Sequence, residues 1–342
     1  MQQVLKKTDT VSIRIDLYGG SNMKRTRIFF TTDVHGSEQC WRKFLNVTTF
    51  YKEIDVALLG GDTTGKVIVP IVEQSDGSWK ASFNKDYHMK TEEEIQEVER
   101  IIRYCGSYPF RTTPAGVEEL ENDKKALDTL FDEVIVSEIE RWMELVEERV
   151  PEHVKVIVNP GNDDSFLIDD VIRKTERVIY PLDGVIYLDD TENHPMISLE
   201  WVNPTPWNSP RECSEKKLRK KIDKLFDMVD PGDYRKLICN FHTPPYGTRL
   251  DEAPKLTKEL KTIQVAGHQL TQPVGSKAVR EAILKNEPLL GIHGHIHESA
   301  GAVTLGKTQL VNPGSEYGEG ILRGYIIDLT EDGIEKFWGT RG

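Results

Sequence analysis

Short apolar segments that each run straight into polar side chains are the feature that most constrains the fold of this chain. In layered α/β folds the residues beyond the carboxyl ends of the strands collect at one edge of the sheets, where active sites form. A repeated pattern of this kind predicts strands that feed one shared site. Five such segments and the residues that follow them are 27–32 with Asp33 and His35, 56–59 with Asp62, 154–158 with Asn162, 236–240 with His242, and 289–292 with His293, His295 and His297.

The last of these segments has the densest cluster of potential ligands, with three of the nine histidines of the chain at 293, 295 and 297. In an extended segment, residues two apart point to the same face, so His295 and His297 are predicted to direct their imidazoles into one site. Pairs at this spacing also occur on solvated strand faces. The partners elsewhere in the chain therefore decide whether the pair binds a metal.

Composition excludes several classes of protein. The 342 residues carry a net charge of -12 without a long basic block, which disfavours nucleic acid and anionic membranes as partners. The four cysteines are scattered without a C-x-x-C pair, which argues against a zinc ribbon or a redox motif. No apolar run approaches the roughly 20 residues that span a bilayer, and the first 20 residues contain no signal-peptide core. We therefore expect a cytoplasmic protein that does not associate with membranes.

The chain organisation is predicted to be one large domain with two additions. Alternating apolar residues at 11–17 predict an edge strand in an N-terminal extension over 1–23, and the main domain follows over 24–342. About 100 residues separate Asp62 from Asn162, too many for one crossover helix. Residues 66–150 are therefore interpreted as an insertion. Its predicted elements are a hairpin over 67–73 and 79–83, a helix from a capping box at Thr91 to about 104, and a helix over 124–149.

The insertion has three interpretations at this stage. It could form a lid over the site or a surface for self-association, which would make the protein a homo-oligomer. The acidic faces of its helices are most simply explained as solvated surface. At the end of the chain, segments 325–329 and 334–338 predict a closing hairpin across a turn.

The strand-end residues, taken in chain order, also match a known signature. They read Asp-x-His, Gly-Gly-Asp, Gly-Asn, His and Gly-His-x-His, and this series resembles the motifs of the calcineurin-like metallophosphoesterases from about Met23 to the C-terminus. The resemblance implies a four-layer α/β/β/α sandwich of two mixed sheets. It also implies a dinuclear metal centre in which Asp62 bridges the ions. In that centre the first metal takes Asp33, His35 and His297, and the second takes Asn162, His242 and His295.

The chemistry of such a ligand set is that of a hydrolase acting on phosphoric esters. A shared carboxylate holds two cations roughly 3.5–4 Å apart, so that they clamp a phosphoryl group and acidify a water molecule. Imidazoles, carboxylates and one amide oxygen suit two divalent ions of manganese, iron or zinc better than magnesium. We therefore expect attack of a metal-bound hydroxide on a small phosphorylated substrate, without a nucleophile from the protein.

The chain departs from the family pattern at Asp163. Many family members have a histidine there, which is taken to stabilise the transition state or to protonate the leaving group. An aspartate instead brings negative charge near the phosphate and supplies a proton only if its pKa is raised. The change favours a phosphodiester substrate over a phosphomonoester. His293 is the candidate to replace the histidine, and an equal alternative is that it only orients a ligand.

Three other functions stay open at this point. The first is a phosphomonoesterase, and the second is a non-catalytic binding or scaffold protein that retains the metal site. A nuclease is disfavoured by the acidic charge balance and by the lack of basic stretches. Residues 60–66 also fit the G-x-x-x-x-G-K pattern of a nucleotide-binding loop. We reject that interpretation, because Val67 stands where a Ser or Thr is needed and the run with Pro70 cannot begin a helix.

Overall fold

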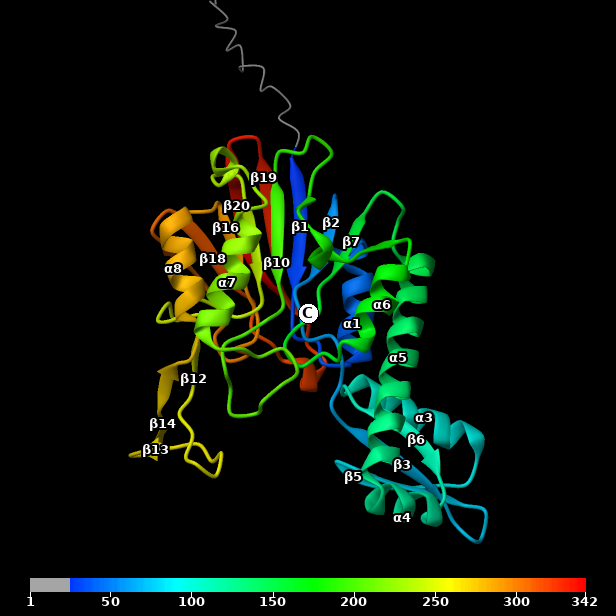
Figure 1. Cartoon of the computed structure of the whole chain (residues 1–342). Helices are drawn as coiled ribbons and strands as arrows, with labels where there is room; N and C mark the ends of the chain where they lie inside the picture. The colour runs from blue at the N-terminus through cyan, green and yellow to red at the C-terminus, as the bar shows by residue number, and fades with distance from the viewer. Residues whose placement is uncertain (1–24) are drawn as a thin grey trace, which may run out of the picture.

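The computed structural model describes residues 25–342, so the edge strand expected at 11–17 lies outside the described residues. Two six-stranded mixed sheets form the body of the molecule (Figure 1). In the first sheet β1, β2, β7 and β8 are parallel to one another. Strand β19 is antiparallel to β1, and β20 is antiparallel to β19. Its strands, in spatial order, are β20 (Gly333–Arg341), β19 (Arg323–Thr330), β1 (Thr26–Thr31), β2 (Val56–Leu59), β7 (Lys155–Val158) and β8 (Val178–Ile179).

The second sheet has the same mixed character. Strands β10, β11, β16 and β18 are parallel, and antiparallel strands β9 and β17 close its two edges. Its strands, in spatial order, are β17 (Gly301–Leu305), β18 (Thr308–Asn312), β16 (Leu290–Ile292), β11 (Ile238–Phe241), β10 (Pro195–Leu199) and β9 (Ile186–Tyr187). The five strands predicted to carry site residues are therefore all present, three in the first sheet and two in the second. The predicted closing hairpin is confirmed as β19 and β20.

Three buried apolar clusters show how the sheets and helices are layered. On β1, Phe29 points into a cluster shared with helices, whereas Ile28 and Phe30 point into a cluster that joins the two sheets. This alternation follows from the two-residue period of a strand. A third cluster lies between the second sheet and its helices. The order is therefore helix, sheet, sheet, helix, and the mixed α/β class expected from the sequence is confirmed.

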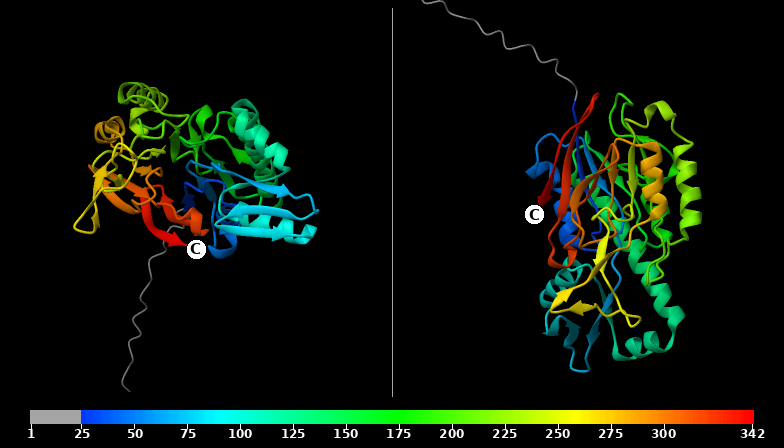
Figure 2. Two further views of the ribbon diagram at one scale, coloured as in Figure 1. Left: turned by 90° about the horizontal axis from the view of Figure 1, so that it is seen from below. Right: turned by 90° about the vertical axis from the view of Figure 1, so that its left-hand side faces the viewer.

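The helices divide between the two outer faces. The first sheet is covered by α1 (Glu38–Leu45), α5 (Lys124–Arg149) and α6 (Leu167–Lys174), with the short α2 (Val47–Phe50) after α1. The second sheet is covered by α7 (Glu215–Phe226) and α8 (Lys277–Asn286), which lie side by side on one outer face in both figures (Figures 1 and 2). In the described part of the chain, no helix has the length and apolar character needed to cross a membrane.

Residues 68–122, here called the inserted unit, form a separate small layer below the body. A four-stranded sheet in the order β5-β4-β3-β6 packs against α3 through its own apolar cluster. The predicted hairpin and the helix with the Thr91 capping box are confirmed as β3–β4 and α3. The bounds are β3 (Ile68–Glu73), β4 (Trp79–Phe83), β5 (Lys85–Met89), α3 (Glu92–Tyr104), β6 (Tyr108–Thr112) and α4 (Pro114–Asn122).

The predicted helix over 124–149 is confirmed as α5, but its buried face belongs to the body. Ile139, Trp142 and Val146 lie in the cluster between the helices and the first sheet, and Trp142 stacks on Trp41 at 4.7 Å between ring centroids. Strands β5 and β6 and helix α4 were not predicted. Strand β6 exists because it pairs in parallel with β3, some 40 residues away, and such a partner leaves no local sequence signal.

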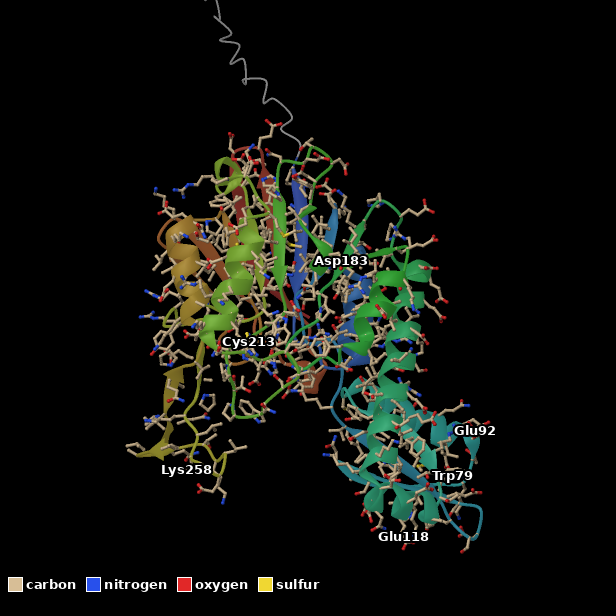
Figure 3. The ribbon with its side chains drawn as sticks, viewed as in Figure 1. Trp79, Glu92, Glu118, Asp183, Cys213 and Lys258 are labelled. Carbon is tan, nitrogen blue, oxygen red and sulfur yellow. The ribbon has the colours of Figure 1, made fainter. Side chains whose placement is uncertain are left out.

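A second projection, here called the arm, consists of residues 252–273. Seen from below, the arm and the inserted unit lie on opposite sides of the body (Figure 2). Trp79, Glu92 and Glu118 mark the inserted unit and Lys258 marks the arm in the side-chain view (Figure 3). The strands of the arm are β12 (Glu252–Pro254), β13 (Gln264–Val265), β14 (His268–Gln269) and β15 (Thr271–Pro273).

Candidate metal centre

The loops that leave the strand ends are held in unusual backbone conformations. Asp33, His35, Asp62 and His295 have φ values of 56°, 41°, 51° and 67°, in a region that side chains other than glycine adopt rarely. Such strain is tolerated where the surrounding structure holds a functional geometry in place. A Cβ on Gly161 would lie 2.2 Å from Asp62 Oδ1, so the glycine of the Gly-Asn motif is required by close approach.

The structure brings the predicted ligands together in two groups. The first contains Asp33, His35 and His297, and the second contains Asp62, His242 and His295; within each group the potential ligand atoms lie within 4.8 Å of one another. The two groups divide Asp33 and the histidines as the family resemblance implies, while Asp62, which the resemblance places on both metals, falls in the second group. A third grouping joins His35, Asp62 and Asp163 by the same distance.

Asp62 lies between the two groups. Its Oδ2 atom is 3.2 Å from Nε2 of His242 and 3.7 Å from Nε2 of His35. Its Oδ1 atom accepts a hydrogen bond of 2.9 Å from the backbone N–H of Asp163, which fixes the rotation of the carboxylate. One carboxylate thus faces ligands of both groups, which is the position that a bridging ligand requires.

The side-chain amide of Asn162 is held through its nitrogen, which leaves its carbonyl oxygen as the free end. Its Nδ2 atom donates to Ser209 Oγ at 2.8 Å and to Asp163 Oδ1 at 3.0 Å. Ser209 Oγ in turn donates to Glu212 Oε1 at 2.7 Å. The Asn162 Oδ1 atom is buried and has no hydrogen-bond partner among residues 25–342, so it is available as a ligand. Supporting hydrogen bonds of this kind orient metal ligands in known sites.

Several buried polar atoms at this site fit a bound cation. Both ring nitrogens of His242 and Nδ1 of His35 have no hydrogen-bond partner within the described residues, and a buried polar atom left in this state costs about 1–3 kcal/mol. His242 Nε2 does lie 3.2 Å from Asp62 Oδ2, an ion-pair distance. His35 Nε2 and His297 Nε2 lie 3.0 Å apart. A divalent metal would satisfy one nitrogen of each imidazole and would offset the repulsion between the two facing Nε2 atoms.

The electrostatics of the cluster favour the metal-binding forms of His35, His295 and Asp33 but the protonated form of His242. Burial lowers the pKa of His35 to about 3 and that of His295 to about 4, so both rings are neutral at neutral pH, as metal ligands must be. Burial alone would raise the pKa of Asp33, but His297 and His242 lower it to about 2. Burial alone would lower the pKa of His242, but the carboxylates, Asp62 above all, raise it to about 9.

Asp163, predicted as a catalytic residue, lies beside the ligands and forms an ion pair with Lys66. Burial and the nearby Asp62 raise the pKa of Asp163 to about 6, against the opposing effect of Lys66. The sequence interpretation gave Lys66 no role. Lys66 follows β2 in the same loop as Thr63 and Thr64. The buried carboxylate of Asp164 accepts hydrogen bonds from the backbone N–H groups of Thr63 and Thr64 and so holds that loop against the site.

His293, predicted as the other catalytic residue, lies behind the ligands. Its ring is buried, and Nδ1 is 2.7 Å from the carbonyl oxygen of Phe241, to which it donates. It lies in none of the ligand groups and does not line the pocket. The predicted extended geometry of 293–297 is wrong, since β16 ends at Ile292 and His295 has a positive φ. The backbone turns after Ile292, so His293 and His295 do not lie on one face as the two-residue period predicted.

A pocket of about 930 Å³ opens at the candidate ligands. Its inner wall contains Asp62, Asn162, His295 and His297, together with the Lys66–Asp163 pair. Its outer wall comes from residues 204–207 and from the arm. Clefts of this size hold ligands as large as a nucleotide or a typical drug.

Comparisons with known proteins give distant relatives. No family model matches the chain. A stretch of 204 residues is 26% identical to Uncharacterized protein MJ1162 of Methanocaldococcus jannaschii and covers 58% of this chain and 82% of that protein.

Two solved structures align with most of the chain. Protein TT1561 of Thermus thermophilus is 14% identical, with 93% of this chain and 99% of that chain covered and a TM-score of 0.47. A conserved uncharacterized protein of Streptococcus pneumoniae, described as a predicted phosphoesterase, is 12% identical, with 94% and 99% covered and a TM-score of 0.30. In the order of its motifs, its two mixed sheets and the residues that its fold gathers, the chain resembles the calcineurin-like metallophosphoesterases.

Proposed function

We propose that this protein is a hydrolase of phosphoric esters that works with two divalent metal ions. The observation that carries the proposal is the position of Asp62, whose Oδ2 atom faces His35 of one ligand group and His242 of the other. A carboxylate between two sets of histidines is suited to two cations and poorly suited to one. The surrounding unpartnered nitrogens and the free oxygen of Asn162 support the same conclusion.

Each proposed ion has a defined set of ligands in this chain. Asp33, His35 and His297 would hold one, Asn162, His242 and His295 would hold the other, and Asp62 would contribute to both. The mixture of imidazole nitrogens and oxygens favours manganese, iron or zinc. When bound, the ions would offset charge on the phosphoryl oxygens and acidify a water molecule.

The Lys66–Asp163 pair takes the place of the family histidine in this proposal. The Lys66 side chain is about half exposed and lines the pocket, so its ammonium can donate to a phosphate oxygen while it stays beside Asp163. The carboxylate of Asp163 repels negative charge on a bound substrate. A phosphodiester carries one negative charge and a phosphomonoester nearly two at neutral pH, so the carboxylate disfavours the monoester more strongly.

His293 has a supporting position in this proposal. Its hydrogen bond to the Phe241 carbonyl oxygen fixes the end of β11, and the next residue along is the proposed ligand His242. The backbone N–H of Gly294 donates to the His242 carbonyl oxygen at 2.9 Å. The strand end that carries His242 is therefore tied to the loop that carries His295.

The first test is metal content together with hydrolysis. Purified protein loaded with manganese, iron or zinc should bind two ions per chain and hydrolyse bis(p-nitrophenyl) phosphate faster than p-nitrophenyl phosphate. Asp62→Ala should lose metal and activity together, whereas Asp76→Ala, which changes an exposed turn of the inserted unit, should keep both. Unchanged activity in Asp62→Ala would refute the proposal. Tight metal binding without hydrolysis of either ester would instead favour the non-catalytic alternative.

A further inference from the structure

The pocket has two chemically different halves. The inner half is charged and contains the proposed metal ligands with Lys66 and Asp163. The outer half is formed by residues 204–207 and by lining residues between 253 and 274. Among the described residues that line this outer half, Lys258 carries the one charge, and Glu298, next to His297, is a further charged residue of the pocket lining. A substrate that fills the whole pocket must therefore combine a phosphate with an uncharged portion.

Trp207 is the largest apolar side chain of the outer half. It lines the pocket, and 66% of its surface is exposed, an unusual state for an indole ring. Pro204 and Pro206, which also line the pocket, limit the conformations of the segment that carries it. Leu260 of the arm lines the same half and is 49% exposed. Apolar surface of this kind inside a pocket marks a binding surface.

The Trp207 segment is anchored at both ends by one carboxylate. Glu212 accepts hydrogen bonds from the backbone N–H of Thr205 at 2.8 Å and from the backbone N–H of Ser209 at 2.7 Å. The hydroxyls of both residues also donate to it, at 2.6 and 2.7 Å. Trp207 itself donates its backbone N–H to the Thr205 hydroxyl at 3.1 Å. The ring is therefore carried by a fixed loop, the same loop that orients Asn162.

The two parts of the outer wall are also linked to each other and to the metal centre. Asn203 donates through Nδ2 to the carbonyl oxygen of Val274, at the base of the arm, with a length of 3.0 Å. Its Oδ1 atom accepts from the hydroxyl of Thr243, next to the proposed ligand His242, at 3.0 Å. The apolar surface is thus held at a set distance from the metals, as a specificity surface needs to be.

We infer that the substrate carries an aromatic ring system beside its phosphate and that this ring stacks on Trp207. The inference rests on the proposed function for the phosphate end. The flat indole of Trp207 matches a flat ring better than a flexible alkyl chain, because stacking covers the whole face of the ring. The outer wall also offers the amide group of Gln272, which can donate to and accept from ring heteroatoms. A heteroaromatic ring of the nucleobase type is therefore favoured over an acyl chain.

Binding of phosphonates tests the inference without any need for turnover. Methylphosphonate, n-hexylphosphonate and phenylphosphonate share one anionic group and differ in the portion that the outer half would contact. Calorimetric titration of the manganese-loaded protein should give the tightest binding for phenylphosphonate, at least about fivefold tighter than for methylphosphonate. Equal binding of the methyl and phenyl compounds, or tightest binding of the hexyl compound, would overturn the inference.

Substitution at Trp207 assigns the effect to this surface. Trp207→Ala should remove the preference for phenylphosphonate and leave the affinity for methylphosphonate within about twofold, while Trp207→Phe should keep most of the preference. Phe50→Ala is the matched control, because Phe50 is exposed at 73% and does not line the pocket. A phenyl preference that survives in Trp207→Ala would overturn the inference.

Hydrolysis of p-nitrophenyl methyl phosphate separates failure of this inference from failure of the proposed function. Turnover of this diester without a phenyl preference in the binding series would contradict the aromatic surface alone. A Trp207-dependent phenyl preference without turnover of any diester would support the surface and contradict the hydrolase.

Discussion

Replacement of Ser209 by alanine should weaken metal binding although Ser209 is not itself a proposed ligand. Ser209 Oγ is the acceptor for Asn162 Nδ2, and it is held in place by its own donation to Glu212. Without it the Asn162 amide can turn over and present its NH₂ group to the cation. Loss of such a supporting hydrogen bond typically lowers metal affinity by about 10- to 100-fold. This corresponds to about 1.4–2.8 kcal/mol of binding free energy.

Titration calorimetry with Mn²⁺ measures this loss, and Ser198→Ala is a matched control. Ser198 is buried and, like Ser209, accepts from an asparagine, in this case Asn240 Nδ2 at 3.1 Å, but that pair lies within the second sheet. Either substitution should lower the free energy of unfolding by about 1 kcal/mol, as measured by urea denaturation. Ser198→Ala should keep wild-type Mn²⁺ affinity. Wild-type affinity in Ser209→Ala, or an equal loss in both variants, would refute the proposed orientation of Asn162.

Further predictions concern the pocket, the acid stability and the core. Lys66→Ala should raise KM for bis(p-nitrophenyl) phosphate about tenfold, because it leaves Asp163 unpaired near the substrate. Lys66→Arg should keep most of the wild-type affinity. An unchanged KM in Lys66→Ala would contradict the role of the pair. Burial alone would raise the pKa of Asp189, but hydrogen bonds led by that from the Asn193 backbone lower it to about 2. Its contribution to stability is therefore present above its ordinary pKa of 3.8 and is lost as the pH falls through about 2, so the acid unfolding of Asp189→Asn should lack this component. Trp142→Ala should lower the free energy of unfolding by about 3–5 kcal/mol in urea denaturation, because the ring is fully buried, and a loss below about 1 kcal/mol would contradict its place in the core.

The expected strands were predictable because each is a short apolar run with its own boundaries. The segment 56–59, for example, was expected from sequence and is β2 in the structure. Helix α3 was equally predictable, since the Thr91 capping box is a local signal. Strand β6 could not be predicted in this way. Its five residues include Pro109, which argues against a strand, and their conformation depends on a parallel partner in β3. Whether the inserted unit acts as a lid or mediates self-association stays a prediction.

The sequence by itself determined which residue types follow the strands, and with them the candidate ligands from Asp33 to His297. That information is local, because a motif and the strand before it are neighbours in the chain. Only the tertiary structure decided that Asp62 faces both ligand groups, that His293 turns away from the pocket, and that Lys66 meets Asp163. These contacts join residues up to 180 positions apart, as for Asp62 and His242, or depend on the backbone leaving the extended conformation. Pairing between distant strands and turns with positive φ set these contacts, and neither can be derived from residue spacing.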